Sequence, residues 1–126
     1  KLYTKILETG GVVLSEYEPQ AKPKPWMYVQ RNRIIAALST IGVLVIEAAE
    51  NSGSLVTAKY ADELGKPILA VPGPITSSVS SGTNLLIKNG QAKMVTSAED
   101  ILSSIKQKNK LNPTCLIWGK IERSFK

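Results

Sequence analysis

Two mainly apolar runs, Val43–Ala48 with the single acid Glu47 and Pro67–Val71, constrain this chain more than any other feature of its sequence. Apolar runs without alternating polar residues are typical of strands that are buried on both faces of a parallel sheet. A helical pattern over Ser54–Leu64 separates the two runs and ends at Gly65, so the connection is long enough for a right-handed crossover. The sequence therefore predicts parallel strands joined by a helix, which is an α/β arrangement.

The rest of the chain extends this alternation on both sides. Three prolines between Pro19 and Pro25 forbid a helix and most strand pairing, so we expect an extended surface loop there. The pattern predicts helices over Leu2–Glu8, Asn32–Ser39, Thr83–Asn89 and Ala98–Lys106, and short apolar runs at Val12–Leu14 and Lys93–Val95. We predict a doubly wound α/β domain with a mostly parallel sheet of about four strands and helices on both faces.

The composition excludes several classes of function. The chain contains no histidine, so it cannot form the usual histidine-based catalytic triads, acid/base relays or zinc sites. The apolar uncharged stretch Ile34–Ile46 is shorter than the roughly 20 apolar residues that a membrane helix needs. No secretory signal is visible, and the lone Cys115 fits a reducing compartment. We expect a cytoplasmic protein without a metal site or a membrane segment.

The net charge of +6 is concentrated at one end of the chain. Residues 1–105 contain ten basic and nine acidic residues, whereas residues 106–126 contain six basic residues and one acid. We therefore divide the chain into a folded body, residues 1–105, and a basic C-terminal tail, residues 106–126, of unassigned structure. The total charge is weak evidence that the body binds polyanions, so local clusters have to be considered instead.

One such cluster lies between Lys22 and Arg33, a stretch that contains no acid. Its cations and aromatic residues are Lys22, Lys24, Arg31, Arg33, Trp26 and Tyr28. Cations interleaved with aromatic rings suit single-stranded nucleic acid, because the charges follow the phosphates while the rings stack on unpaired bases. The alternative is a solvated loop whose two rings fold back onto the sheet.

The expected start of the following helix strengthens the nucleic-acid interpretation. Arg31 and Arg33 flank the predicted N-cap Asn32, where cations are unfavourable by about 0.3–1 kcal/mol. An anion should therefore lie nearby. A ligand phosphate would satisfy both arginines, and a carboxylate such as Glu16 or Glu18 is the structural alternative.

A second candidate site follows the first buried strand, at Ser52, Gly53 and Ser54. Small residues at a strand-to-helix turn leave backbone N–H groups open to a phosphate, although a plain serine cap explains the same residues. The serine-rich segment Ser77–Thr83 follows the next strand, and we expect an ordinary polar helix cap there. Ligands of doubly wound folds bind outside the carboxyl ends of the strands, which is where both segments fall.

Several motifs occur in one order over residues 1 to 96. They are LSEY (Leu14–Tyr17), the basic proline-rich loop leading to Tyr28, RNRIIAALS (Arg31–Ser39), VIEAAENSGSLVTA (Val45–Ala58), ADELGK, AVPGPI (Ala70–Ile75) and SSGTNLLIKNGQA (Ser80–Ala92). With these motifs the chain resembles the DNA-processing protein A family, also called DprA or Smf. The resemblance implies a Rossmann-like domain that binds single-stranded DNA, forms a homodimer, protects incoming strands during natural transformation and helps to load a RecA-type recombinase. It implies no catalysis and no cofactor.

The family's DNA site is a basic pocket, and its pattern can be matched to this chain residue by residue. The aromatic residue three positions before the Arg-Asn-Arg element matches Tyr28, where Phe is usual, and an upstream basic residue matches Lys24. The resemblance thus implies that the DNA-binding residues are Lys24, Tyr28, Arg31, Asn32, Arg33, Ser52, Gly53 and Ser54.

The chain departs from the family pattern at both ends. The family domain normally begins with further strands, including a Gly-Ser-Arg turn whose arginine joins the pocket, and many members end with a small winged-helix-like domain. This chain therefore resembles the second half of the Rossmann-like domain. A buried-type strand with an open edge favours pairing with another chain, so we expect weakened DNA binding together with self-association or a partner fragment.

Two other functions compete with DNA binding. The chain could be a nucleotide-binding hydrolase similar to the phosphoribohydrolases of the lysine-decarboxylase-like family, which carry a catalytic Glu on the helix after the phosphate-binding turn. Here Thr57 is followed by Ala58, Lys59 and Tyr60, so that Glu is missing. The chain could also be a dimerisation piece that does not bind DNA by itself.

Overall fold

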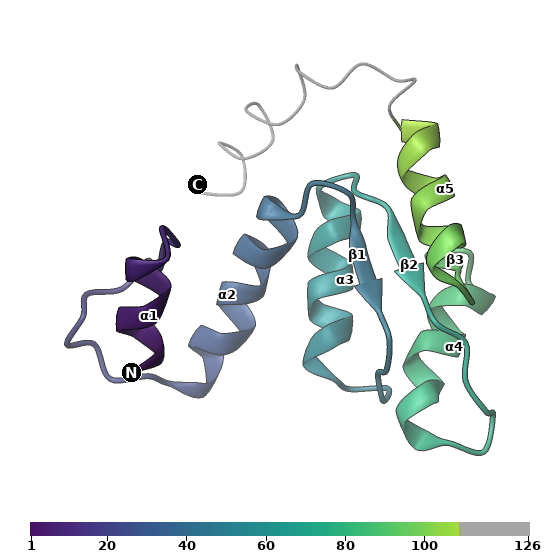
Figure 1. Ribbon diagram of the computed structural model, residues 1–126. Coiled ribbons are helices and arrows are strands. Elements are labelled where there is room, and N and C mark those ends of the chain that lie inside the picture. The colour runs from purple at the N-terminus through teal and green to yellow at the C-terminus, as the bar shows by residue number, and fades with distance from the viewer. Residues whose placement is uncertain (109–126) are drawn as a thin grey trace.

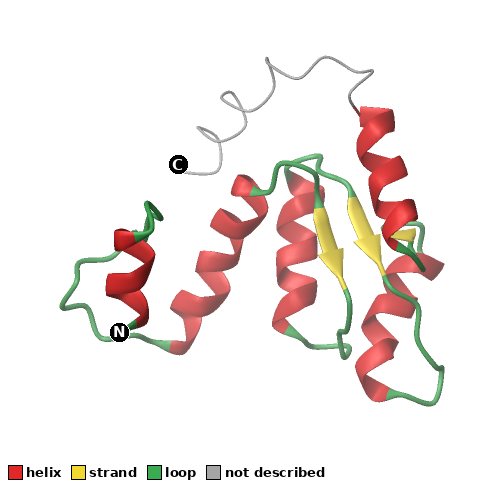
Figure 2. Cartoon of the chain, in the orientation of Figure 1, coloured by secondary structure: helices red, strands yellow, loops and turns green. Residues whose placement is uncertain are grey.

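The computed structural model describes residues 1–108. Residues 109–126, most of the predicted tail, lie outside the described part of the chain. The elements follow in the order α1 (Leu2–Glu8), α2 (Pro25–Leu38), β1 (Val43–Val45), α3 (Gly53–Glu63), β2 (Ile68–Ala70), the 3-10 turn η1 (Ser78–Ser80), α4 (Ser81–Lys88), β3 (Lys93–Met94) and α5 (Ala98–Lys108) (Figures 1 and 2). The predicted alternation of helices and strands is confirmed from β1 onward.

The described strands form one parallel sheet in the order β1-β2-β3. Val43, Leu44 and Val45 pair with Ile68, Leu69 and Ala70, and the last two of these pair with Lys93 and Met94. The sheet has three strands, whereas about four were expected, because Val12–Leu14 pairs with nothing and is exposed to solvent. The α/β class and the parallel pairing are confirmed.

The core lies between one face of the sheet and helices α3 and α4. Both crossovers run in the same direction along the sheet, so right-handed connections place these two helices on the same face. The sheet contributes Val45, Ile68 and Ala70 to this core, and α3 contributes Ala58 and Ala61. Small alanines let the helix approach the strands closely, so the core is dense although its side chains are small.

Helix α2 begins at Pro25, so the predicted start at Asn32 was wrong. Proline forbids a helix interior but suits its first position, because its fixed φ fits the helix and its missing N–H would have no acceptor there. No proline follows Pro25 before the helix ends at Leu38. Residues 26–31, for which no element was predicted, therefore lie on the helix, and residues 19–24 of the predicted loop are non-helical.

Helix α2 packs along α3 (Figure 1), and two contacts fix its C-terminal end to the sheet. Lys66 Nζ donates to the carbonyl oxygens of Ala37 and Ser39, the latter at 2.6 Å, which satisfies groups left open at the end of a helix. The next turn brings Gly42 against the chain before β2, with φ at +151°, and a Cβ at this position would overlap the carbonyl oxygen of Pro67.

The edge strands of the described sheet are β1 and β3. Among the described residues β1 pairs only with β2, and Leu44 on the face away from α3 and α4 is 38% exposed. Helix α1 buries none of its residues. No helix in the described range 1–108 combines the length and the apolar character that a membrane crossing requires. The expected self-association through the strand edge stays a prediction.

Replacing Gly42 with Ala should lower the free energy of unfolding by about 2–4 kcal/mol, because the added Cβ meets backbone and the φ angle is unfavourable for alanine. Chemical denaturation would measure the change. Gly53→Ala is the matched control, since a Cβ there meets no atom closer than 4.0 Å and its loss should stay within about 0.5 kcal/mol. Equal losses in the two variants would contradict the assigned packing at Gly42.

Candidate nucleic-acid interface

The N-terminal ends of α2, α3 and α4 lie together at the end of the sheet toward which β1 and β2 point, the lower end in Figure 1. Ligands of doubly wound folds bind at this end. We call the site formed here by Lys24, Tyr28, Arg31 and the turn Ser52–Ser54 the α2–α3 interface. The start of α3 packs against the middle of α2, at Asn32, and Tyr28 and Lys24 lie about one and two turns from Asn32 toward the start of α2.

The first part of this interface is the exposed beginning of α2. Lys24 is the N-cap residue of the helix, and the first turn contains no acid. Tyr28 and Arg31 are separated by one helical turn and are both exposed, which places them on one face of the helix. A cation and an aromatic ring therefore stand side by side on a rigid element.

Asn32 joins this part of α2 to α3. It is only 9% exposed, and its Nδ2 donates to the carbonyl oxygen of Gly53 at 3.2 Å. Its Oδ1 accepts from Arg31 Nε at 3.4 Å. Asn32 is thus an interior residue of the helix, not the exposed N-cap that the sequence predicted. Its amide links the Arg31 guanidinium to the first residue of α3.

The second part of the interface is the start of α3. Ser52 is its N-cap residue, but its side chain makes no cap hydrogen bond, and no acid lies in the first turn. Within residues 1–108, Ser52 Oγ is a buried oxygen without a hydrogen-bond partner. The first N–H groups of a helix have no intrahelical acceptor and carry its positive end. This turn can therefore donate to an anion.

Helix α5 shows how the same chain satisfies a helix start internally. One carboxylate oxygen of Asp100 accepts from the backbone N–H of Thr96 at 2.9 Å and from that of Ser97 at 3.1 Å. These hydrogen bonds, led by those of Thr96, hold the pKa of the Asp100 carboxyl below its usual value. Helices α1 and α4 also begin without a side-chain cap hydrogen bond, so within residues 1–108 the start of α3 is distinguished by the buried Ser52 Oγ that has no hydrogen-bond partner.

The start of α4 fixes the loop that precedes the α3 turn. Gly82 N donates to the carbonyl oxygen of Ala48 at 2.8 Å, and a Cβ on Gly82 would lie 2.7 Å from that oxygen. Ser81 and Thr83 donate to carbonyl oxygens within their own segment, at 2.7 Å and 3.1 Å. These hydroxyls donate to carbonyl oxygens, and neither η1 nor α4 has a side-chain cap hydrogen bond, so the polar helix cap predicted for Ser77–Thr83 was wrong. The segment supports the interface from one side through the Gly82 contact.

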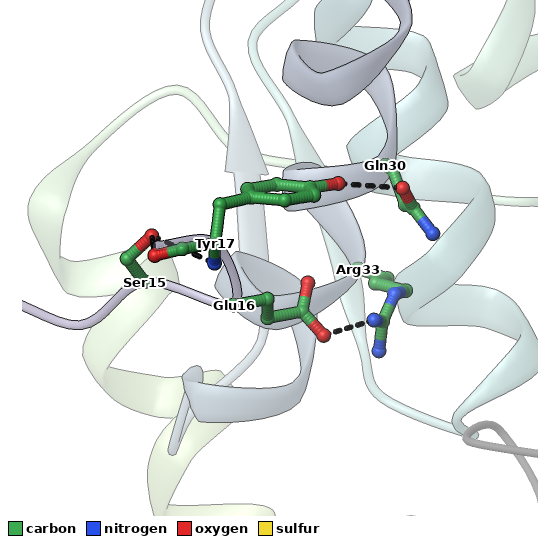
Figure 3. Close-up of polar contacts among 5 residues, drawn as sticks. All are labelled: Ser15, Glu16, Tyr17, Gln30 and Arg33. Carbon is green, nitrogen blue, oxygen red and sulfur yellow. Dashed lines mark hydrogen bonds and ion pairs between the residues drawn. The ribbon is translucent and has the colours of Figure 1, made fainter. Parts of the chain in front are cut away.

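Arg33 does not join the α2–α3 interface. Successive helical residues are rotated by about 100°, so Arg31 and Arg33 point to different sides of α2. Arg33 Nη2 forms an ion pair with Glu16 Oε1 (Figure 3). The two arginines therefore do not hold one phosphate together, and the anion beside Arg33 is the carboxylate that the sequence offered as the structural alternative.

The ion pair is part of a clasp that sequence reasoning missed. We define the clasp as the turn Ser15–Tyr17 together with Trp26, Gln30 and Arg33 of α2. The Tyr17 hydroxyl donates to Gln30 Oε1 at 2.7 Å (Figure 3), and its ring meets the Trp26 ring at 80°, with the centroids 6.2 Å apart. The spacing of the three α2 residues marks one helix face, which becomes visible once the helix begins at Pro25.

One groove lies away from the α2–α3 interface, and the described part of the chain has no cluster of metal-binding side chains. A groove of 230 Å³ between α3 and α4 is lined mainly by apolar side chains such as Leu55, Leu85 and Leu86. It contains none of the residues that the sequence assigned to DNA. Within the described part of the chain, no three histidine, cysteine, aspartate or glutamate side chains gather as a metal site would require.

Comparisons with known proteins agree with this arrangement. The family described as DNA recombination-mediator protein A matches residues 1–106. Protein Smf of Escherichia coli K12 is 47% identical over 105 residues, which are 83% of this chain and 28% of that protein. The chain thus spans about a third of the length of such relatives.

Two solved structures share the fold. DNA processing protein A from Streptococcus pneumoniae superimposes with a TM-score of 0.68 at 39% identity, covering 83% of this chain and 38% of that one. The structure that describes the single-stranded DNA binding mode of DNA processing protein A from Helicobacter pylori gives a TM-score of 0.62 at 33% identity, covering 76% of this chain and 42% of that one. The predicted Rossmann-like fold is confirmed.

Replacing Asn32 with Ala should lower the free energy of unfolding by about 1–2 kcal/mol, because the hydrogen bond between the buried Asn32 amide and the Gly53 carbonyl oxygen is lost. Denaturant unfolding would measure the loss. Asn51→Ala removes an exposed amide from the neighbouring loop and should change stability by less than about 0.5 kcal/mol. If Asn32→Ala were as mild as this control, the amide would not join the two helices.

Proposed function

The chain belongs to the DNA recombination-mediator protein A family, and we propose on that premise that it binds single-stranded DNA at the α2–α3 interface. The observation that carries the proposal is the link through Asn32, which holds the Arg31 guanidinium beside the uncapped start of α3. A cation and a set of unsatisfied N–H groups at one place are what a backbone phosphate requires.

In this proposal each group has a separate role. Arg31 and the backbone N–H groups of Gly53 and Ser54 bind one phosphate, and the exposed Lys24 attracts a neighbouring one. Tyr28 is 56% exposed and offers a ring face on which an unpaired base can stack. Asn32 positions Arg31 rather than contacting DNA. Arg33 supports the fold through Glu16 and stays outside the contact set.

The proposal involves binding without catalysis or a cofactor. The related hydrolases need a Glu on the helix after the phosphate-binding turn, and the first acid of α3 is Asp62, near the helix end. The uncapped turn therefore supports phosphate binding and gives no support to phosphoribohydrolase chemistry.

We extend the proposal to a wider role. The chain would act in the cytoplasm on DNA taken up during natural transformation, where it would protect the strand and help to load a RecA-type recombinase. A homodimer is the proposed assembly. The support for this wider role is the family membership together with the structure of the Helicobacter pylori relative that describes a single-stranded DNA binding mode.

The proposed dimer predicts a mass in solution near twice 13.6 kDa, which multi-angle light scattering would measure. The open edge of β1 is one surface that favours association. A monodisperse monomer at every concentration would contradict the dimer and leave the DNA site untouched.

Arg31→Ala should weaken binding to every single-stranded sequence and lower the slope of log K against log salt by about one unit, because one phosphate contact is lost. Fluorescence anisotropy with labelled oligo-dT over a salt series would measure both effects. The matched control is Lys88→Ala, which removes an exposed cation from the last turn of α4 and should leave the slope unchanged.

Two results would contradict this proposal in different ways. An unchanged slope in Arg31→Ala would remove Arg31 from the site. Absence of binding by the parent chain would favour a dimerisation piece without DNA contacts of its own.

A further inference from the structure

Trp26 is the prominent feature of α2 that the proposed function leaves unused. It lies in the first turn of the helix, between Lys24 and Tyr28, and is 52% exposed. No acid occurs between residues 19 and 33. A large exposed ring among cations is the combination that single-stranded nucleic acid recognises.

The Trp26 ring is held in place by the clasp. The edge-to-face contact with Tyr17 backs it, and the Tyr17 hydroxyl is itself fixed by Gln30 at 2.7 Å. The turn that carries Tyr17 is closed by Ser15 Oγ, which accepts from Tyr17 N at 3.0 Å (Figure 3). A ring that is fixed before binding loses little conformational entropy when a ligand stacks on it.

The acid within the clasp does not oppose a polyanion at this ring, because Glu16 is paired with Arg33. The exposed Glu18, which follows Tyr17, adds one negative charge beside the clasp. Lys24 precedes the ring by two residues, and the α2 first turn carries the positive end of the helix without an acid to answer it. The residue types of the LSEY motif thus support the ring without blocking it.

Trp26 and Tyr28 point to different sides of α2. Two residues correspond to a rotation of about 200°, and a helix with its side chains is about 10–12 Å wide. A strand with one base on Tyr28 can continue across the start of α2, where Lys24 lies, and reach Trp26 with a later base. The strand must be long enough to cross the helix end.

We propose that Trp26, backed by Tyr17, is a second stacking site for a base of the same single strand. The inference rests on the proposed function, since it extends the strand bound at the α2–α3 interface. Trp26 would contribute stacking to any base and therefore raise affinity without sequence preference.

The experiment uses the 126-residue chain carrying Trp118→Phe, which leaves Trp26 as the sole tryptophan. Trp26 emission is followed while oligo-dT of about 4 to about 16 nucleotides is added, with anisotropy measured in parallel. The expected result is quenching that saturates together with binding for the longer strands and is weak for the shortest.

Trp26→Ala should weaken binding of the longer strands by about 5-fold to 100-fold, and the shortest strand much less. Trp26→Phe keeps a ring and should retain most of the affinity. Tyr17→Phe keeps the Tyr17 ring against Trp26 but removes the hydroxyl that donates to Gln30, so it separates the two contacts. The matched control is Tyr3→Ala, which removes an exposed ring of α1 and should have no effect.

The outcomes separate this inference from the proposed function. If Arg31→Ala weakens binding but DNA binding by the parent chain leaves Trp26 emission unchanged, the inference is overturned and the proposed function stands. The Trp26 ring would then serve only the clasp. A loss of affinity that is the same for short and long strands would also overturn it. Absence of binding at every length would overturn the proposed function and the inference with it.

Discussion

The arrangement of the candidate site depends on the buried amide of Asn32. A polar side chain inside a helix pair is costly unless it is hydrogen-bonded, and Asn32 meets this requirement by donating to Gly53 and accepting from Arg31. The same bonds set the position of α2 on α3. Packing and site geometry are therefore coupled, because the contact that stabilises the helix pair also places a cation beside the start of α3.

The parts of the fold that the sequence predicts well are those with a strong local signal. Two apolar runs flank α3, and Gly65 follows its end, so β2 and α3 lie within one residue of their expected bounds, whereas β1 begins at Val43 as expected and ends three residues early, at Val45. Val12–Leu14 looked similar by composition, but a strand exists only when a neighbour pairs with it. The local sequence does not indicate whether a neighbouring strand is present to pair with it.

The sequence predicted which residues the candidate site contains, but it did not predict how they are arranged. Pro25 was counted among the residues that break a helix, whereas proline at the first position begins one. The predicted start of α2 was seven residues too late, which placed Arg31 and Arg33 together at the end of the helix. In the structure both arginines lie within α2 and point to different sides of it. Which carboxylate meets Arg33 depends on tertiary contacts of the Ser15–Tyr17 turn, and the sequence could only name Glu16 or Glu18 as an alternative to a phosphate.

The central claim is that Arg31 and the start of α3 bind one phosphate of a single strand. The most direct measurement is the change in the NMR resonances of the Gly53 and Ser54 backbone amides and of Arg31 Nε as oligo-dT is added to the chain. The account predicts that all three shift together and saturate at the same DNA concentration. Shifts confined to other residues, with these three unmoved while DNA binds, would contradict it.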